Sequence, residues 1–170
     1  MSASTNSPER YSRAGQTTGR RLELWIRPGT REDGASRLVA RARALEADDC
    51  VEAVEVREWD AYQDLSSRLH SHRERDARVA LQAFKRWAWQ HGSELVGFGE
   101  RRRAGRGRMG PEYVTQRVPW ALLAEYQNGV LVNVTPCDHE RRARCISERL
   151  ERLDSPESAD EFSSRSRLIG

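Results

Sequence analysis

The strongest constraint on the fold is an Asn-Gly pair that lies between two runs of alternating apolar residues. Asn128 and Gly129, preceded by Gln127, separate residues 122–126 from residues 130–134. Asn and Gly both tolerate the positive φ angles that a tight hairpin turn requires. The pattern therefore predicts an antiparallel hairpin, and with it a sheet that must bury at least one face.

The N-terminal third of the chain has the pattern of a strand, a helix and a second strand. Apolar and polar residues alternate over residues 22–26, and Pro28-Gly29 ends that run. Residues 31–47 carry apolar side chains at helical spacing, and residues 51–59 again have the character of a strand. A short strand-helix-strand unit favours two parallel strands joined by a right-handed crossover.

A second helix is predicted near the middle of the chain, after residues 60–75, which are polar and irregular. Gly92 is placed to end this helix, because glycine commonly takes the left-handed conformation that follows a helix. The predicted apolar stripe of the helix, at i, i+3, i+4 and i+7 spacing, consists of Val79, Ala80, Ala83, Phe84, Trp87 and Ala88.

The rest of the pattern is mostly β until a last helix. Residues 95–99 and 113–118 are predicted as strands that flank an arginine-rich loop. Beyond the hairpin, Thr135 has the features of a helix N-cap, with Pro136 at the first helical position. The predicted buried face of this last helix comprises Ala143, Ile146, Leu150 and Leu153.

These elements together predict one α+β domain over residues 21–153, in the order β-α-β-α-β-β-β-β-α. The expected architecture has two layers, with helices packed on a mixed, mostly antiparallel sheet of about five or six strands and a core that covers both faces in part. Residues 1–20 and 154–170 are poor in apolar side chains. Burial there would not offset the entropy of ordering, so both ends are expected to be disordered.

Composition narrows the function without stating it. The chain has 29 basic and 26 acidic residues, a net charge of +3, which is too balanced to indicate nucleic-acid binding by itself. Lys85 is the only lysine, and arginine pairs bidentately with phosphate where lysine does not. The sparse, odd set of three cysteines and the lack of an apolar run of roughly 20 residues favour a cytoplasmic protein without membrane contact.

The arginine-rich loop is the clearest candidate for contact with a partner. An exposed finger of this kind can lie along a phosphate backbone, where each arginine displaces a counterion. The alternative is a solvated loop, which a run of charges often is. The candidate nucleic-acid contacts are Arg101, Arg102, Arg103, Arg106 and Arg108 in the loop and Arg117 on the strand that follows.

Cys137, His139 and Cys145 are weak candidates for metal ligands. Their spacing matches no structural zinc pattern, and small buried thiols are the alternative, so no metal and no other cofactor is predicted. Cys137 at the start of a helix would have a lowered thiol pKa, but no base or orienting group accompanies it. No catalytic residue is predicted.

The tryptophans are the remaining candidates for a contact surface. Trp87 lies on the predicted apolar stripe of its helix and is assigned to the core. Trp89 lies off that stripe, and Trp25 lies on the opposite face of its strand from Leu24. These two either pack against each other or mark a surface for a partner.

Several segments resemble a family of small, largely uncharacterised haloarchaeal proteins labelled as helix-turn-helix domain proteins. The resemblance covers about residues 20–153. It is carried by RLELWIRPG, VEAVEVREWD, FKRWAWQHG and, most specifically, PEYVTQRVPWALLAEYQNGVLVNVTPC at residues 111–137. It implies DNA binding and provides no catalytic residue. Two features depart from the family: the charge is mildly basic where members are usually strongly acidic, and the loop before Tyr113 is unusually rich in arginine. The predicted strand at residues 51–59, between the first two helices, also differs from two helices joined by a short turn.

The sequence therefore predicts a non-enzymatic, cytoplasmic regulatory protein that contacts the DNA backbone through its arginine-rich loop. A protein-interaction or ligand-sensing domain, with Trp25 or Trp59 on an open sheet face, is the alternative. A free sheet edge would allow pairing with a second copy or another protein.

Overall fold

The computed structural model of the chain describes residues 19–29, 32–66, 71–99, 101–104, 113–137 and 143–155. Most of the two ends that were expected to be disordered lies outside these residues, as do Arg106, Arg108 and His139. Ten elements follow in the order β-α-β-β-α-β-β-β-β-α. The predicted α+β class and element order are confirmed, with one additional short strand.

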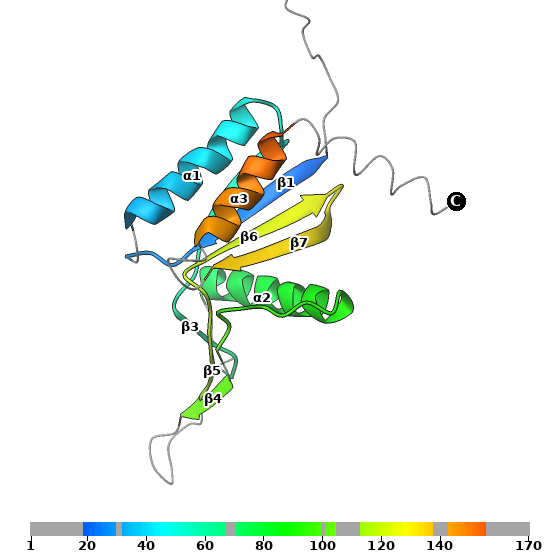
Figure 1. The fold of residues 1–170 in the computed structure, drawn as a ribbon. Coiled ribbons are helices and arrows are strands. Elements are labelled where there is room, and N and C mark those ends of the chain that lie inside the picture. Colours follow the sequence, from blue (N-terminus) through cyan, green and yellow to red (C-terminus); the bar gives the residue numbers. More distant parts are fainter. Residues whose placement is uncertain are drawn as a thin grey trace, which may run out of the picture.

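A four-stranded sheet forms the centre of the fold, with the strand order β2-β1-β6-β7 (Figure 1). The strands are β1 (Arg20–Ile26), β2 (Ala53–Glu58), β6 (Ala121–Gln127) and β7 (Val130–Cys137). β1 and β2 are parallel, and α1 (Glu32–Ala47) connects them, which confirms the predicted crossover unit. The other two pairings are antiparallel.

The hairpin between β6 and β7 has the predicted turn. Asn128 and Gly129 have φ angles of 50° and 80°, so both lie in the left-handed region that this turn needs. The predicted helix start at Thr135 is wrong. β7 continues to Cys137, with Thr135 opposite Leu123, because β7 is an edge strand in which a proline at position 136 need not break the ladder.

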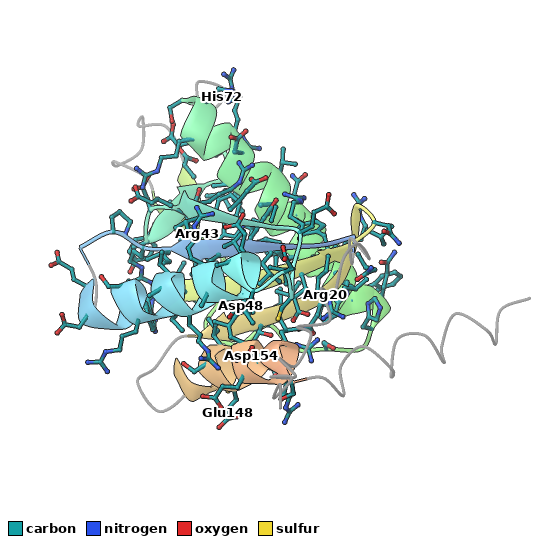
Figure 2. The ribbon with its side chains drawn as sticks, turned by 90° about the horizontal axis from the view of Figure 1, so that it is seen from above. Arg20, Arg43, Asp48, His72, Glu148 and Asp154 are labelled. Carbon is teal, nitrogen blue, oxygen red and sulfur yellow. The ribbon has the colours of Figure 1, made fainter. Side chains whose placement is uncertain are left out.

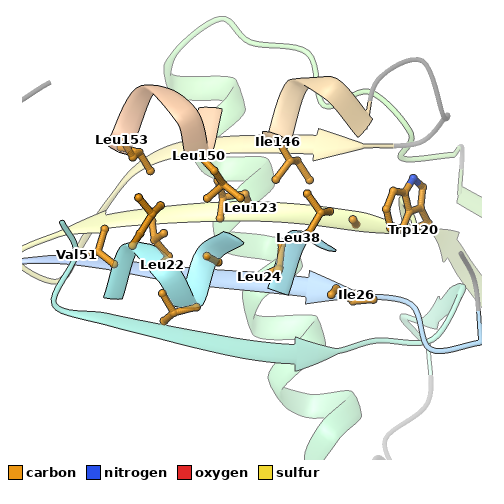
Figure 3. Packing of buried hydrophobic residues seen from close by; sticks show 14 residues of the cluster. Leu22, Leu24, Ile26, Leu38, Val51, Trp120, Leu123, Ile146, Leu150 and Leu153 are labelled. Atoms are coloured by element: carbon orange, nitrogen blue, oxygen red, sulfur yellow. The ribbon is translucent and has the colours of Figure 1, made fainter. Parts of the chain in front are cut away.

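α1 and α3 (Ala143–Asp154) cover one face of this sheet (Figure 1). Leu38 and Leu45 of α1 and Leu150 of α3 pack with Leu24 and Leu123 of the sheet, as Figure 3 shows for most of this cluster. The predicted buried face of the last helix is confirmed for Ile146, Leu150 and Leu153.

α2 (His72–Gln90) packs on the opposite face of the sheet. Its buried residues include Leu81 and Phe84, which meet Trp25, Trp59 and Leu122. The core thus covers both faces of the central sheet, as expected. Because helices pack on both faces, the central sheet is the middle layer of three, where two layers were predicted. β1 and β6 carry apolar side chains on both of their faces, which is why both faces require a cover.

The predicted apolar stripe of α2 is wrong in one position. Val79 is 68% exposed, whereas Ala77 and Leu81 are buried. The buried face of α2 consists of Ala77, Ala80, Leu81, Phe84 and Ala88. Val79 lies on the other side of the helix.

Residues 60–75 contain regular structure that the polar composition conceals. β3 (Tyr62–Asp64) lies within this segment, and α2 begins before Val79, at His72. Ser71 caps the helix: its hydroxyl accepts a hydrogen bond from the Glu74 N–H at 3.2 Å, and the Glu74 carboxylate accepts one from the Ser71 N–H at 2.7 Å. This reciprocal capping box defines the start of α2.

β3 belongs to a second, smaller sheet with the order β3-β5-β4. β5 (Tyr113–Arg117) is its central strand and β4 (Arg101–Ala104) is an edge. The predicted strand at residues 95–99 is wrong. Gly97 has a φ angle of 87°, outside the range of a strand, and the strand ladder with β5 begins at Arg101.

A cluster of polar side chains surrounds the buried carboxylate of Glu23 on β1. This carboxylate accepts hydrogen bonds from Arg21 at 2.7 Å and from Trp25 and the Tyr126 hydroxyl at 3.2 Å. Burial, reinforced by the charge of Glu23, raises the pKa of Tyr126 to about 12.

Stability at high pH should therefore depend on Tyr126. The folded protein holds the phenolic proton more tightly than the unfolded chain, whose pKa is 10.0, so this contribution is complete below pH 10 and is lost as pH rises toward 12. Because the ring is partly exposed, we expect a loss of about 1 kcal/mol. Denaturant titrations at pH 9 and 11.5 should show this loss in the wild type and not in Tyr126→Phe. An equal loss in both proteins would contradict it.

Candidate nucleic-acid interface

The charges of α1 and α3 are balanced. α1 carries three arginines and three carboxylates, and α3 carries the same numbers. Arg41 of α1 pairs with Asp154 of α3 at 2.9 Å. Figure 2 shows this side of the molecule, with Arg43 and Asp48 near one helix and Glu148 and Asp154 on the other. Interspersed charges of both signs give no field that would attract a polyanion.

The positive surplus lies instead on α2 and the small sheet, which together we call the basic side. α2 carries five basic and two acidic residues. The three strands of the small sheet carry four arginines and one carboxylate, that of Asp64. The four strands of the central sheet have three arginines and four glutamates. Among these elements the positive surplus therefore lies on α2 and the small sheet, although Arg73 of α2 pairs with Glu58 at 3.3 Å and with Asp60 at 3.6 Å.

The arginines predicted to contact DNA fall partly in this small sheet. Arg101, Arg102 and Arg103 lie in β4, so this part of the predicted loop is an edge strand. A strand partner explains the difference, because each of the three is paired with a residue of β5. Arg106 and Arg108 lie outside the described residues. In the sequence they come between β4 and β5.

Arg117 lies at the end of β5, beside the entry to β4. The Gly99 N–H donates to the Arg117 carbonyl at 3.2 Å. A Cβ atom on Gly99 would lie only 3.0 Å from that of Arg117, so glycine permits this close approach. Arg101 pairs with Gln116, the neighbour of Arg117. The fold thus brings four of the six predicted contacts into one small sheet.

Gln116 fastens this sheet to α2. Its side chain is buried, donates to the Gly99 carbonyl at 2.7 Å and accepts a hydrogen bond from the Lys85 ammonium of α2. Arg78 of α2 donates to the Leu65 carbonyl, next to β3, at 3.4 Å. Two basic residues of α2 therefore hold the small sheet against the helix. Figure 1 shows that α2 and the small sheet lie on the side of the central sheet away from α1 and α3.

α2 also presents a row of exposed side chains that the sequence analysis did not identify. The two carboxylates of the helix lie near its start: Glu74 is in the capping box, and Asp76 lies 3.5 Å from Arg57 and from His72. From Ala77 to Ser93 there is no acidic residue. The row, which we call the outer stripe of α2, consists of Arg75, Val79, Gln82, Arg86 and Trp89.

The structure separates the two tryptophans whose role the sequence left open. Trp25 is buried against Trp59, with ring centroids 5.3 Å apart. Trp89 is 83% exposed and does not pack on Trp25. Of the two, only Trp89 is available to a partner. The signal in the sequence was its position off the apolar stripe of the helix.

The weak metal candidates do not form a site within the described residues. Cys137 ends β7 instead of starting a helix, so the prediction of a thiol at a helix N-terminus is wrong. Cys145 is exposed on α3. In the described ranges, no three His, Cys, Asp or Glu side chains are grouped so that they could hold a metal ion. None of the described helices is long and apolar enough to span a bilayer.

A family model described as a helix-turn-helix domain matches residues 14–158 of the chain. The chain belongs to this helix-turn-helix family. Membership confirms that part of the resemblance seen in the sequence, while a haloarchaeal origin stays a prediction. No curated protein and no solved structure matches this family member.

The helices of this helix-turn-helix family member are not arranged as the family description suggests. β2 and β3 lie between α1 and α2 in the chain, and β4 to β7 lie between α2 and α3. Among the described elements, no two helices are therefore joined by a short turn. The described elements therefore do not have the geometry of the usual helix-turn-helix motif.

Proposed function

We propose that the protein is a non-enzymatic, cytoplasmic regulator that binds DNA through its basic side. The observation that carries this proposal is the polarised charge: α1 and α3 are balanced, and the surplus is on α2 and the small sheet. Membership in a helix-turn-helix family supports DNA as the partner.

The mechanism is neutralisation of the phosphate backbone. Arg101, Arg102 and Arg103 on β4 and Arg117 on β5 are candidate contacts, joined by Arg106 and Arg108 in the segment between these strands. Each arginine that pairs with a phosphate releases counterions, so affinity falls steeply with salt. Such contacts position the protein on a duplex and do not read its sequence.

Exchange of the five arginines from Arg101 to Arg108 for serine tests this proposal. We expect the affinity for a fluorescein-labelled 20-base-pair duplex of random sequence to fall by about 100-fold or more at 0.1 M salt, because up to five phosphate contacts are lost. A variant with lysine at the same five positions keeps the charge and should retain most of the affinity. Fluorescence anisotropy measures both. Undiminished binding by the serine variant would refute the proposal.

The alternative of a sensing domain with Trp25 or Trp59 on an open sheet face loses its support. Both side chains are buried beneath α2. Self-association through a sheet edge remains a prediction, and β7 is the better candidate edge. β7 carries no charged residue, whereas β2 carries three, and charges on an edge strand oppose pairing with another strand.

A further inference from the structure

We infer that the outer stripe of α2 is a second DNA-contact surface, which lies against the bases in the major groove while the small sheet holds the phosphates. This inference rests on the proposed function and assigns a role to side chains outside the arginine-rich segment. Its first support is the exposure of Trp89, 83%, and of Val79, 68%. On a helix whose other face is buried in the core, these two large apolar side chains lie on one exposed row and are available to a partner.

The composition of the stripe indicates the class of partner. Arg75, Gln82 and Arg86 accompany the two apolar residues, and α2 has no carboxylate after Asp76. The absence of carboxylates from the stripe suits a polyanion such as DNA. Arginine and glutamine are also the side chains that pair with guanine and adenine edges, and an aliphatic side chain can contact the methyl group of thymine.

The dimensions of the stripe fit a duplex groove. Its members recur every three or four residues over the 15 residues from Arg75 to Trp89, so they form one row about 21 Å long. The major groove of B-DNA is about 12 Å wide and admits an α-helix. The small sheet is fastened beside α2 by the contacts of Lys85 with Gln116 and of Arg78 with the Leu65 carbonyl. α2 and the small sheet are therefore held together.

Trp89 provides a direct readout of contact. Of the five tryptophans, Trp25, Trp59 and Trp120 are at most 2% exposed, and Trp87 is stacked on His91 at 4.7 Å. Acrylamide should thus quench mainly Trp89. In the full-length protein we expect addition of the random 20-base-pair duplex to reduce this quenching at least about twofold, because the groove covers the ring. Trp89→Phe should show little quenching and no such change.

The binding test uses Arg75→Ser/Arg86→Ser, with Arg37→Ser/Arg41→Ser on the balanced α1 as a control of equal charge. We expect about tenfold or greater loss of duplex affinity at 0.1 M salt for the α2 pair and less than about twofold for the α1 pair. All four positions are exposed, so thermal melts should change little.

The outcomes separate the inference from the proposed function. If the wild type binds and the five-serine variant does not, yet the α2 pair binds like the α1 pair and the duplex leaves Trp89 quenching unchanged, the stripe is not a DNA surface and the proposed function stands. If Trp89→Ala alters sedimentation and leaves DNA affinity intact, the stripe contacts a second copy and the inference is wrong. If the wild type does not bind duplex, both are wrong.

Discussion

Replacement of Trp59 by alanine should lower the free energy of unfolding by about 3–5 kcal/mol, the usual cost of truncating a large aromatic side chain in a core. Trp59 has no exposed surface and lies with its ring centroid 5.3 Å from that of Trp25, 6.5 Å from Phe84 and 6.2 Å from Phe98. Phe98 precedes β4, so the same substitution should loosen the attachment of the small sheet. Urea or guanidinium titrations measure the loss.

The matched control is Trp89→Ala, which removes the same side chain from an exposed position. Its effect on stability should stay within about 0.5 kcal/mol. The indole N–H of Trp59 has no hydrogen-bond partner among the described residues. Trp59→Phe should therefore be tolerated better than Trp59→Ala, because phenylalanine fills most of the space and leaves no buried donor unpaired. Equal losses for Trp59→Ala and Trp89→Ala would contradict the assignment of these two residues.

The second large effect is expected at the buried ion pair between β6 and α3. Glu125 is 1% exposed, and Arg149 donates two hydrogen bonds, of 2.6 and 2.8 Å, to its carboxylate. Asn133 of β7 donates a third at 2.6 Å. Removal of one partner from such a pair leaves a buried charge without its counterion.

Arg149→Ala should accordingly cost about 3 kcal/mol, the lower end of the range for a broken buried pair. The lower end applies because Arg20, which is also buried and is influenced by the charge of Glu125, remains as a partial counterion. The double variant Glu125→Leu/Arg149→Met should recover part of this stability, since it removes the uncompensated carboxylate, while buried Arg20 loses the charge of Glu125. A single-variant loss below about 1 kcal/mol, or no recovery in the double variant, would contradict this account.

The central sheet could be predicted from the sequence because its signals are local. Asn128-Gly129 defines the turn between β6 and β7, and alternation identifies β1. The ends of elements were less predictable. The Thr135-Pro136 pair has the local features of a helix start, and its place in β7 depends on the pairing of Thr135 with Leu123, far from it in the chain. β3 is only 3 residues long, too short to give a pattern.

The candidate site was predicted in part for the same reason. The run of arginines can be recognised directly from the sequence. That three of them form strand β4 depends on pairing with β5, which the local sequence pattern does not show. The outer stripe of α2 was missed because Val79 fits an apolar spacing as well as the residues that are buried. Which side of the helix meets the sheet is determined by Leu81 and Phe84 against Trp25 and Trp59, a contact between distant segments.

The most direct test of DNA binding through the basic side is the salt dependence of duplex affinity. We expect the logarithm of the association constant to fall linearly with the logarithm of salt concentration, and the slope to become shallower by about 1 for each arginine removed that had contacted a phosphate. The five-serine variant should therefore have a much shallower slope than the wild type, while Arg37→Ser/Arg41→Ser on α1 should keep the wild-type slope. No binding at low salt, or equal slopes for the wild type and the five-serine variant, would contradict the account.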